Sequence, residues 1–270
     1  MARAVNEGAV TLDGLCKRYG DVDAVVNLSL DVPGGQFFSL LGPSGCGKTT
    51  TLRMLAGFEE PTSGRILIGG ADMTRTPAHK RPVNTVFQNY ALFTHLTVKD
   101  NVGFGLAMKK VPKPERERRV ARLLERVRLS KFANHRPHQL SGGMKQRAAI
   151  ARALVESPDF IMMDEPFAAL DFQTRVLMQR FLLEVWLEFK PTIIFVTHHI
   201  DEAVLLADRV VVMSAGPGWI IEEVLINLPR PRRMTDPGFN DFRARLTETL
   251  EREVMRAHVE DELRPESHAA

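Results

Sequence analysis

The sequence has few cysteines and few aromatic residues, and it has no long apolar run. Its 270 residues include two cysteines, two tryptophans and two tyrosines. Cys16 and Cys46 cannot build a framework of disulfides, which excludes a small disulfide-bonded secreted fold and suits a reducing cytosol. No apolar run approaches the roughly 18 residues that a membrane-spanning helix needs. The polar segment Met1–Gly8 lacks the apolar core of a secretion signal.

A large excess of one charge is also absent. The chain has 36 Lys and Arg against 33 Asp and Glu, a formal net charge of +3. Such a balance argues against a dedicated nucleic-acid-binding protein, so no nucleic-acid partner is expected. Hydrophobic residues make up 44% of the chain, which is enough for a large core. Basic residues crowd between Lys109 and Arg128, where a solvated helix face is favoured over a binding patch.

What the sequence does contain is a phosphate-binding pattern of the form Gly-x4-Gly-Lys-Ser/Thr. The segment comprises Gly42, Pro43, Ser44, Gly45, Cys46, Gly47, Lys48, Thr49 and Thr50. An apolar run precedes it and a helix-like run follows, so backbone N–H groups and a helix N-terminus would face phosphate oxygens. Lys48 would neutralise the outer phosphates and Thr49 would ligate Mg2+, which predicts binding of a nucleoside triphosphate. The same N–H groups should favour the thiolate of Cys46.

Two kinds of strand pattern indicate an α/β fold. Apolar and polar residues alternate at Val10–Cys16 and Val26–Val32, which predicts an N-terminal antiparallel sheet with one exposed face. Short unbroken apolar runs at Phe160–Met163, Thr192–Thr197 and Arg209–Met213 are typical of buried parallel strands separated by helices. We therefore expect a mainly parallel sheet covered by helices, beside a smaller antiparallel one.

A helical region, at about residues 89–158, is expected to be inserted into this core. Apolar residues recur at helical spacing at Val120, Leu123, Leu124 and Val127. Further on, Ser141, Gly142 and Gly143 open an alanine-rich helix. From these residues alone, the segment could be a simple helix cap or a second phosphate contact.

Polar residues gather at the predicted carboxyl ends of the parallel strands. Gln88, Asp164, Glu165 and His198 each follow an apolar run, and ligands of such sheets bind at that edge. Asp164 could hold the metal, Glu165 could orient or deprotonate an attacking water, and His198 could contact that water or the γ-phosphate. The alternatives are a helix-capping carboxylate pair and a structural histidine.

These motifs resemble, over nearly the whole chain, those of the ATP-binding subunits of ABC transporters. In order they resemble the Walker A loop, the Q-loop glutamine, the family signature, Walker B with its catalytic glutamate, the D-loop and the switch histidine. The matching residues are Gly42–Thr50, Gln88, Leu140–Gly143, Phe160–Glu165, Ala169–Asp171 and His198. Tyr19 matches the aromatic residue that stacks on adenine in this family, and Gln88 matches a residue that touches Mg2+.

The resemblance implies a P-loop ATPase core, residues 1–230, followed by a C-terminal helix and polar tail, residues 231–270. It implies that two cassettes, most simply a homodimer, face each other head to tail. Ser141, Gly142 and Gly143 would then cap the γ-phosphate of the partner's ATP. The inserted helices and Gln88 would dock a membrane permease that is served by an extracytoplasmic solute-binding protein. The subunit would be peripheral, on the cytoplasmic face of the cell membrane.

The sequence also departs from the family pattern in ways that bear on the mechanism. Met144 stands where glutamine is common, and Ala168 and Ala169 stand where serine is frequent. His199 follows His198 where aspartate is usual, so two histidines compete for the switch position. The register of the preceding strand favours His198.

The segments point to two groups of importers. Those at 141–147, 200–208, 213–223 and 228–232 resemble the nitrate, sulfonate and taurine importers, which this sequence therefore favours as relatives. The segment at 80–93 resembles polyamine, iron or sugar importers instead. Those usually carry a long C-terminal domain, whereas about 55 residues follow Gly216 here.

Other classes fit less well. A non-transport ABC ATPase of DNA repair would carry a long coiled coil, and no sustained heptads occur. A small-molecule kinase with a P-loop would lack the signature at Leu140–Gly143. A catalytically silent regulator is disfavoured by the presence of both Glu165 and His198.

Overall fold

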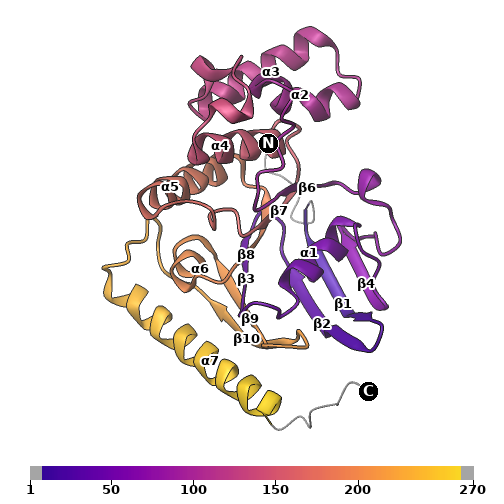
Figure 1. Ribbon diagram of the computed structural model, residues 1–270, viewed down its shortest axis with the longest axis vertical. Helices are drawn as coiled ribbons and strands as arrows, with labels where there is room; N and C mark the ends of the chain where they lie inside the picture. Colours follow the sequence, from indigo (N-terminus) through magenta and orange to yellow (C-terminus); the bar gives the residue numbers. More distant parts are fainter. Residues whose placement is uncertain (1–7, 263–270) are drawn as a thin grey trace, which may run out of the picture.

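A computed structural model describes the backbone of residues 8–262 and the side chains of residues 8–259. It contains a four-stranded sheet in the order β2-β1-β4-β5 and a six-stranded sheet in the order β10-β9-β3-β8-β7-β6 (Figure 1). The first sheet is antiparallel, and the second is parallel except for β10. This is the mixed α/β architecture expected from the sequence. The predictions for residues 1–7 and 263–270 lie outside the described residues.

The antiparallel sheet begins with a long hairpin. Its strands are β1 (Val10–Tyr19), β2 (Val22–Val32), β4 (Ser63–Ile68) and β5 (Ala71–Asp72). Alternate residues Val10 and Leu12 of β1 are buried against the core, as the sequence pattern predicts, and Leu15 is buried beyond a shift in register. The strands are longer than predicted because the polar end of β1 pairs with β2 up to Tyr19–Val22. Gly20, at φ 56°, permits the tight reversal.

The parallel sheet carries the buried strands predicted from the short apolar runs. Its strands are β3 (Phe37–Leu41), β6 (Val83–Val86), β7 (Phe160–Asp164), β8 (Thr192–Thr197), β9 (Arg209–Met213) and β10 (Ile220–Leu225). β3 lies in the middle, between β9 and β8, and all five of its residues are buried. The carboxyl ends of β3, β7 and β8 therefore meet at one edge, where open α/β sheets bind their ligands.

Seven α-helices are described, and several begin at a side-chain cap. They are α1 (Lys48–Ala56), α2 (Val98–Met108), α3 (Lys113–Arg126), α4 (Gly142–Leu154), α5 (Phe172–Phe189), α6 (Ile200–Leu206) and α7 (Pro237–Glu262). Short 3-10 turns lie at Ala78–Lys80, Ser130–Phe132 and Pro137–Gln139. The side chain of Thr97 caps α2, that of Ser141 caps α4 and that of Asp171 caps α5, each by accepting from a backbone N–H.

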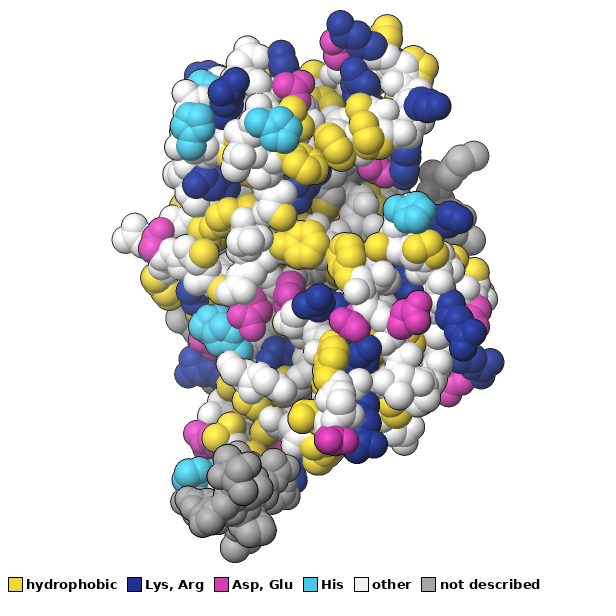
Figure 2. All heavy atoms as spheres, turned by 45° about the vertical axis from the view of Figure 1, so that its right-hand side comes forward, with side chains coloured by type: hydrophobic (Ala, Val, Ile, Leu, Met, Phe, Trp, Pro, Cys, Tyr) yellow, Lys and Arg dark blue, Asp and Glu magenta, His cyan; other side chains and the backbone are white. Residues whose placement is uncertain are grey.

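Helices α2, α3 and α4 gather at one end of the molecule (Figure 1). The predicted stripe on α3 is buried, with Val120, Leu123 and Leu124 facing the core. Asn101 of α2 is fully buried and its amide donates to the carbonyls of Phe93, Leu96 and Thr97. Lys and Arg side chains lie on the outside of this end, around patches of apolar side chains (Figure 2).

Helix α7 covers one flank of the parallel sheet. Phe239 and Leu246 are fully buried, and Thr249 donates to Glu222 of β10 at 2.7 Å. The carboxylate of Glu253 accepts from the backbone N–H of Ala215 at 3.0 Å. The helix runs to Glu262 and is the helix expected between residues 231 and 270. Over the described residues, no helix is both long and apolar enough to cross a membrane.

The two sheets are joined at Gly218. Val25 of β2 forms a parallel bridge with Gly218. The N–H of Val26 donates to the Gly218 carbonyl, and the N–H of Gly218 donates to the Ala24 carbonyl, both at 2.9 Å. A β-carbon at Gly218 would lie 2.5 Å from the carbonyl oxygen of Cys46. Glycine is therefore required where the junction passes the phosphate-binding segment.

Candidate nucleotide site

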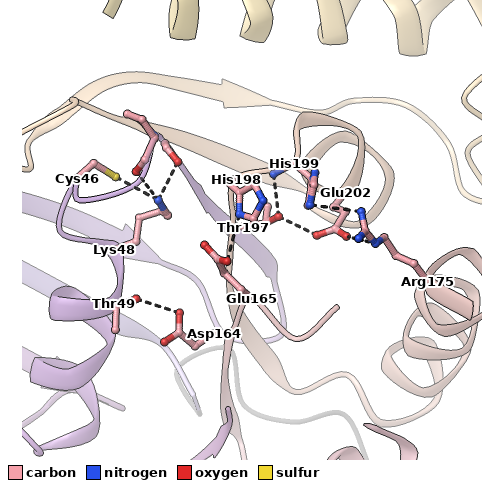
Figure 3. Close-up of polar contacts among 12 residues, drawn as sticks. Cys46, Lys48, Thr49, Asp164, Glu165, Arg175, Thr197, His198, His199 and Glu202 are labelled. Carbon is pink, nitrogen blue, oxygen red and sulfur yellow. Dashed lines mark hydrogen bonds and ion pairs between the residues drawn. The ribbon is translucent and has the colours of Figure 1, made fainter. Parts of the chain in front are cut away.

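The phosphate-binding segment forms a tight loop between β3 and α1. Gly45 and Gly47 have φ values of 81° and 85°, which favour glycine. Gly47 lies so close to β2 that a β-carbon would sit 2.7 Å from the Ala24 carbonyl oxygen. The side chain of Lys48 is almost buried and folds back across the loop, where its ammonium donates to the carbonyls of Gly42 and Pro43 at 2.7 Å each (Figure 3).

Cys46 differs from the sequence expectation. Its side chain is fully buried, and its Sγ lies 3.4 Å from Lys48 Nζ. Burial raises the pKa of the Cys46 thiol, and this effect outweighs the opposing influence of Lys48. The prediction that Cys46 is present as a thiolate is therefore wrong. The side chain packs beneath Gly42 in the core, away from solvent, and desolvation penalises its charged form.

Thr49 and Asp164 meet across the edge of the sheet. Thr49 Oγ1 donates to Asp164 Oδ1 at 3.2 Å (Figure 3). Burial raises the pKa of Asp164, and the neighbouring charge of Glu165 adds to the effect, while Thr49 and Lys48 oppose it. A cation at this position would relieve that burial cost by pairing with the carboxylate.

This donor set fits Mg2+. A hydroxyl and a carboxylate are hard oxygen ligands, and Mg2+ commonly completes its shell with substrate phosphates and water. Within the described residues, no group of three or more His, Cys, Asp or Glu could hold a metal ion without such help. Thr49 and Asp164 are thus the pair that would hold the metal. Gln88 follows β6 and is exposed, and it stays a predicted third ligand.

Glu165 and His198 form a second polar pair. His198 Nδ1 lies 3.1 Å from Glu165 Oε2 (Figure 3). Glu165 has a φ of 43°, and its N–H donates to the Val196 carbonyl of β8 at 3.0 Å. This bond fixes the carboxylate next to the end of the neighbouring strand. The structure thus brings together Lys48, Asp164, Glu165 and His198, as the sequence predicts.

His199, the competing histidine, lies in a different environment. Its Nε2 is 3.3 Å from Arg175 Nη1 of α5, and no contact with Glu165 is described for it. Burial lowers the pKa of His199, and the positive charges of His198 and Arg175 lower it further. The geometry therefore favours His198 as the histidine that acts beside Glu165.

The predicted signature lies at the start of α4. Ser141 is exposed and its Oγ accepts from the Met144 N–H at 3.4 Å, which is the helix-cap alternative. Gly142 and Gly143 pack so tightly that β-carbons would lie 3.1 Å from Leu170 and 2.8 Å from Thr174. None of their described contacts is with the phosphate loop of the same chain. A phosphate contact for this segment stays a prediction.

Tyr19, the predicted adenine-stacking residue, lies at the tip of the β1–β2 hairpin. Its side chain is 43% exposed. Lys17 Nζ lies 4.8 Å from the ring centroid and covers part of the ring. The structure leaves stacking possible at this position, and the role stays a prediction.

Four residues behind the histidines were not singled out by the sequence. Glu202 is nearly buried and accepts from Thr197 Oγ1 at 2.7 Å and from Gln179 Nε2 at 3.2 Å. Arg175 Nε lies 3.9 Å from the same carboxylate. In the sequence, Glu202 is an ordinary acidic residue in the first turn of a helix. No local sequence pattern indicates that Glu202 contacts Thr197, or that it contacts Gln179 and Arg175 on a helix more than twenty residues earlier.

Comparison with known proteins decides the family. Residues 25–168 match the family model described as ABC transporter. The chain belongs to the ABC transporter family. It is 53% identical over 205 residues to the spermidine/putrescine import ATP-binding protein PotA of Nitrosomonas eutropha, covering 76% of this chain and 56% of that relative. It is 44% identical over 266 residues to the protein of the same name from Aliivibrio fischeri, covering 94% and 70%.

Solved structures support the same assignment. The chain resembles the ATP-binding cassette MJ0796, described as a dimer in a post-hydrolysis state bound to ADP and Pi, with a TM-score of 0.70 and 32% identity. This match covers 82% of this chain and all of that one. Against cbiO1 from Clostridium perfringens the TM-score is 0.74 at 30% identity, covering 82% of this chain and 89% of that one.

These matches confirm the predicted fold and the predicted family, and they correct the narrower resemblance. The relatives reported above are spermidine/putrescine import proteins, not nitrate, sulfonate or taurine importers. The segments that favour the nitrate group are short, and the few residues after Gly216 do not separate the two groups. The segment at 80–93, which includes β6, pointed to the better group. The chain spans little more than half of the Nitrosomonas relative.

Proposed function

We propose that this chain is the ATP-hydrolysing subunit of an importer for polyamines such as spermidine or putrescine. ATP hydrolysis is supported by one observation above all: His198 Nδ1 lies 3.1 Å from Glu165 Oε2, beside the phosphate loop that contains Lys48. The polyamine part is supported by the 53% identity to the Nitrosomonas import protein. Glutamate next to a metal-binding aspartate is the arrangement that phosphoryl transfer to water needs.

Binding of ATP begins with Lys48. Its ammonium now donates to the carbonyls of Gly42 and Pro43, and phosphate oxygens would replace or share these acceptors. The N–H groups of the loop and of the first turn of α1 add further donors. Thr49 and Asp164 would hold Mg2+, which supplies charge neutralisation on the phosphates when it is bound.

Hydrolysis depends on Glu165. The carboxylate would orient a water molecule for attack on the γ-phosphate and accept its proton. His198 contacts the same carboxylate. It can therefore accept a hydrogen bond from Glu165 once Glu165 has taken up the proton of the water, or donate a hydrogen bond to the γ-phosphate. Neither residue needs to move far, because the end of β7 is fixed to β8 by the Glu165 N–H bond.

A second subunit would complete the site. Ser141 is exposed at the start of α4. Gly142 lies against Leu170 and Gly143 lies against Thr174 of α5, so neither faces the phosphate loop of its own chain. A helix start of this kind suits the γ-phosphate of a nucleotide held by another chain. The dimeric description of a similar cassette supports a head-to-tail homodimer.

The permease would dock at the helical end. A groove of about 780 Å³ runs between α2 and α3, with apolar walls at Phe104, Ala107, Val120 and Leu124. Such a groove fits an amphipathic helix from a partner. Docking there would hold the subunit on the cytoplasmic face of the membrane, as a peripheral protein. An extracytoplasmic solute-binding protein would deliver the polyamine to the permease.

The hydrolytic part is tested by measuring phosphate release from MgATP with the purified chain. Glu165→Gln should lose activity, whereas Glu248→Gln, on the exposed face of α7, should retain it. Normal turnover by Glu165→Gln would remove this residue from the mechanism. No turnover by the wild-type chain, alone or with its permease in vesicles, would refute the proposed hydrolysis.

The solute is tested by uptake in cells that lack the gene. Radiolabelled spermidine and putrescine uptake should return with the wild-type gene and not with the Glu165→Gln gene. Excess unlabelled polyamine should compete for uptake. Unchanged polyamine uptake in the deletion strain would contradict the proposed solute without affecting the proposed ATPase.

A further inference from the structure

The contact between Arg175 and His199 has a defined polarity. Arg175 Nη1 lies 3.3 Å from His199 Nε2 (Figure 3). A guanidinium has five N–H donors and no acceptor, so it is the donor in this contact. His199 Nε2 must therefore be unprotonated, which places the proton of the neutral ring on Nδ1. The tautomer of His199 is thus set by Arg175.

The ring of His199 supports that of His198. The two ring centroids are 4.1 Å apart and the planes are inclined by 41°. His198 in turn contacts Glu165 through Nδ1. A sideways movement of the His199 ring would therefore displace the ring that touches the proposed water-activating carboxylate.

Arg175 is itself fixed from two sides. Its Nη2 donates to the Leu170 carbonyl at 3.2 Å, in the loop that precedes α5. Its Nε lies 3.9 Å from the nearly buried carboxylate of Glu202. The backbone of His199 is held as well, because its N–H donates to Thr197 Oγ1 at 3.0 Å. Both partners of the contact are therefore held by neighbours within the chain.

We propose that Arg175 and His199 are a positioning pair that holds the ring of His198 against Glu165 and links it to the loop at Leu170. The proposal rests on the proposed ATP hydrolysis, in which Glu165 is the water-activating residue. The hydrogen bonds and ion pairs described for Arg175 and His199 lead to each other, to Leu170, Thr197 and Glu202, and none leads to the phosphate loop. A loss of placement of about 1 Å in a catalytic group can lower a rate by about 100-fold.

The first test uses the folded chain without nucleotide, so it does not depend on ATPase activity. NMR of isotope-labelled histidine should show His199 as the neutral tautomer with the proton on Nδ1. In Arg175→Lys, which shortens the donor, the fraction of this tautomer should fall. A protonated Nε2 in the wild-type chain would overturn the proposal even if the chain hydrolyses ATP at full rate.

The second test separates positioning from stability. His199→Leu removes the acceptor for Arg175, whereas His199→Gln offers an oxygen at about the place of Nε2. We expect kcat to fall by about 10- to 100-fold in His199→Leu, with KM for MgATP unchanged, and to be largely restored in His199→Gln. Thermal unfolding should occur at similar temperatures in both variants. His79→Leu, at an exposed histidine, is the matched control and should be unaffected.

The comparison between the two variants decides the outcome. Equal kcat values for His199→Leu and His199→Gln, whether both normal or both impaired, would overturn the proposed role of the acceptor. A change in KM with kcat intact would also overturn it. If the wild-type chain showed no ATP hydrolysis, the proposed function would fail. The NMR measurement of the His199 tautomer would still test the contact between Arg175 and His199.

Discussion

His198 Nδ1 and Glu165 Oε2 lie 3.1 Å apart, although more than thirty residues separate them in the chain. The proximity follows from the adjacent parallel strands β7 and β8, whose carboxyl ends coincide at the pairing of Asp164 with Val196. Glu165 continues one strand and His198 the other. The pair therefore depends on strand register, and each of its members can be changed without altering the nucleotide-binding loop.

Glu165→Gln is expected to trap an ATP-bound dimer. Glutamine keeps the size of the side chain but cannot accept the proton of the attacking water, a loss that typically slows a reaction by about 100- to 10,000-fold. Lys48, Thr49 and Asp164 are unchanged, so ATP should still bind. Size-exclusion chromatography with MgATP should show twice the monomer mass, and adding Ser141→Arg should abolish the shift. A variant that binds ATP tightly and stays monomeric would contradict a site shared between two chains.

Lys48→Ala should lose nucleotide binding. The ammonium is the charged donor of the loop, and its two acceptors, the Gly42 and Pro43 carbonyls, would lose their partner. Binding of a fluorescent ATP analogue measures the loss, with Lys113→Ala on the exposed face of α3 as the control. Since the lysine also braces the loop, a lower unfolding temperature without ATP is expected too. Unchanged affinity would show that phosphate does not meet this residue.

Cys46 should react slowly with thiol reagents, and Cys16 should react first. Cys46 is fully buried and its pKa is raised by burial, whereas Cys16 is only half-buried. Mass spectrometry of peptides after timed labelling at neutral pH gives the order, and Cys16→Ser isolates the Cys46 reaction. Labelling of Cys46 should accelerate as pH rises. If Cys46 were labelled rapidly at neutral pH, and if MgATP blocked this labelling, the phosphate loop would have to open in solution.

Glu202 should make stability depend on pH. Burial raises its pKa above the ordinary value of 4.5, so the folded chain binds this proton more tightly than the unfolded chain. The resulting stabilisation is complete below pH 4.5 and is lost as pH rises through the folded pKa. Glu202→Gln should flatten the decline of unfolding free energy over that range, as measured by urea titration at several pH values. Parallel curves for the two proteins would contradict a raised pKa.

Much of the fold and of the site could be predicted from the sequence because the signals are local. The alternation in β1 and β2 and the unbroken apolar runs of β3, β7, β8 and β9 each reflect burial of one face or of both faces. The phosphate loop is recognisable because its backbone favours glycine at positions 45 and 47, where φ is positive. The strand ends then place Asp164, Glu165 and His198 at one edge by topology alone.

The remaining features depend on tertiary contacts that leave no local pattern. Cys46 lies within a loop of N–H groups, yet its side chain is directed into the core, so burial decides its pKa. The partner of His199 is Arg175, on a helix that is remote in sequence. The importer group leaves no such local pattern. The segment at 200–208, which favours the nitrate group, is largely buried, so packing in the core accounts for its residues without reference to a solute.

Gly218 gives the phosphate loop an unexpected dependence on the late part of the chain. The backbone of this residue bonds to β2 on both sides and passes directly over Cys46. Gly218 and the β2 residues Ala24 and Val26, more than 190 positions apart in the chain, thus form one clamp over the loop. A fragment ending at Met213 would keep every motif of the nucleotide site and still lack this clamp. When the cassette is shortened for expression or fused to another domain, the cut should therefore lie well beyond β10.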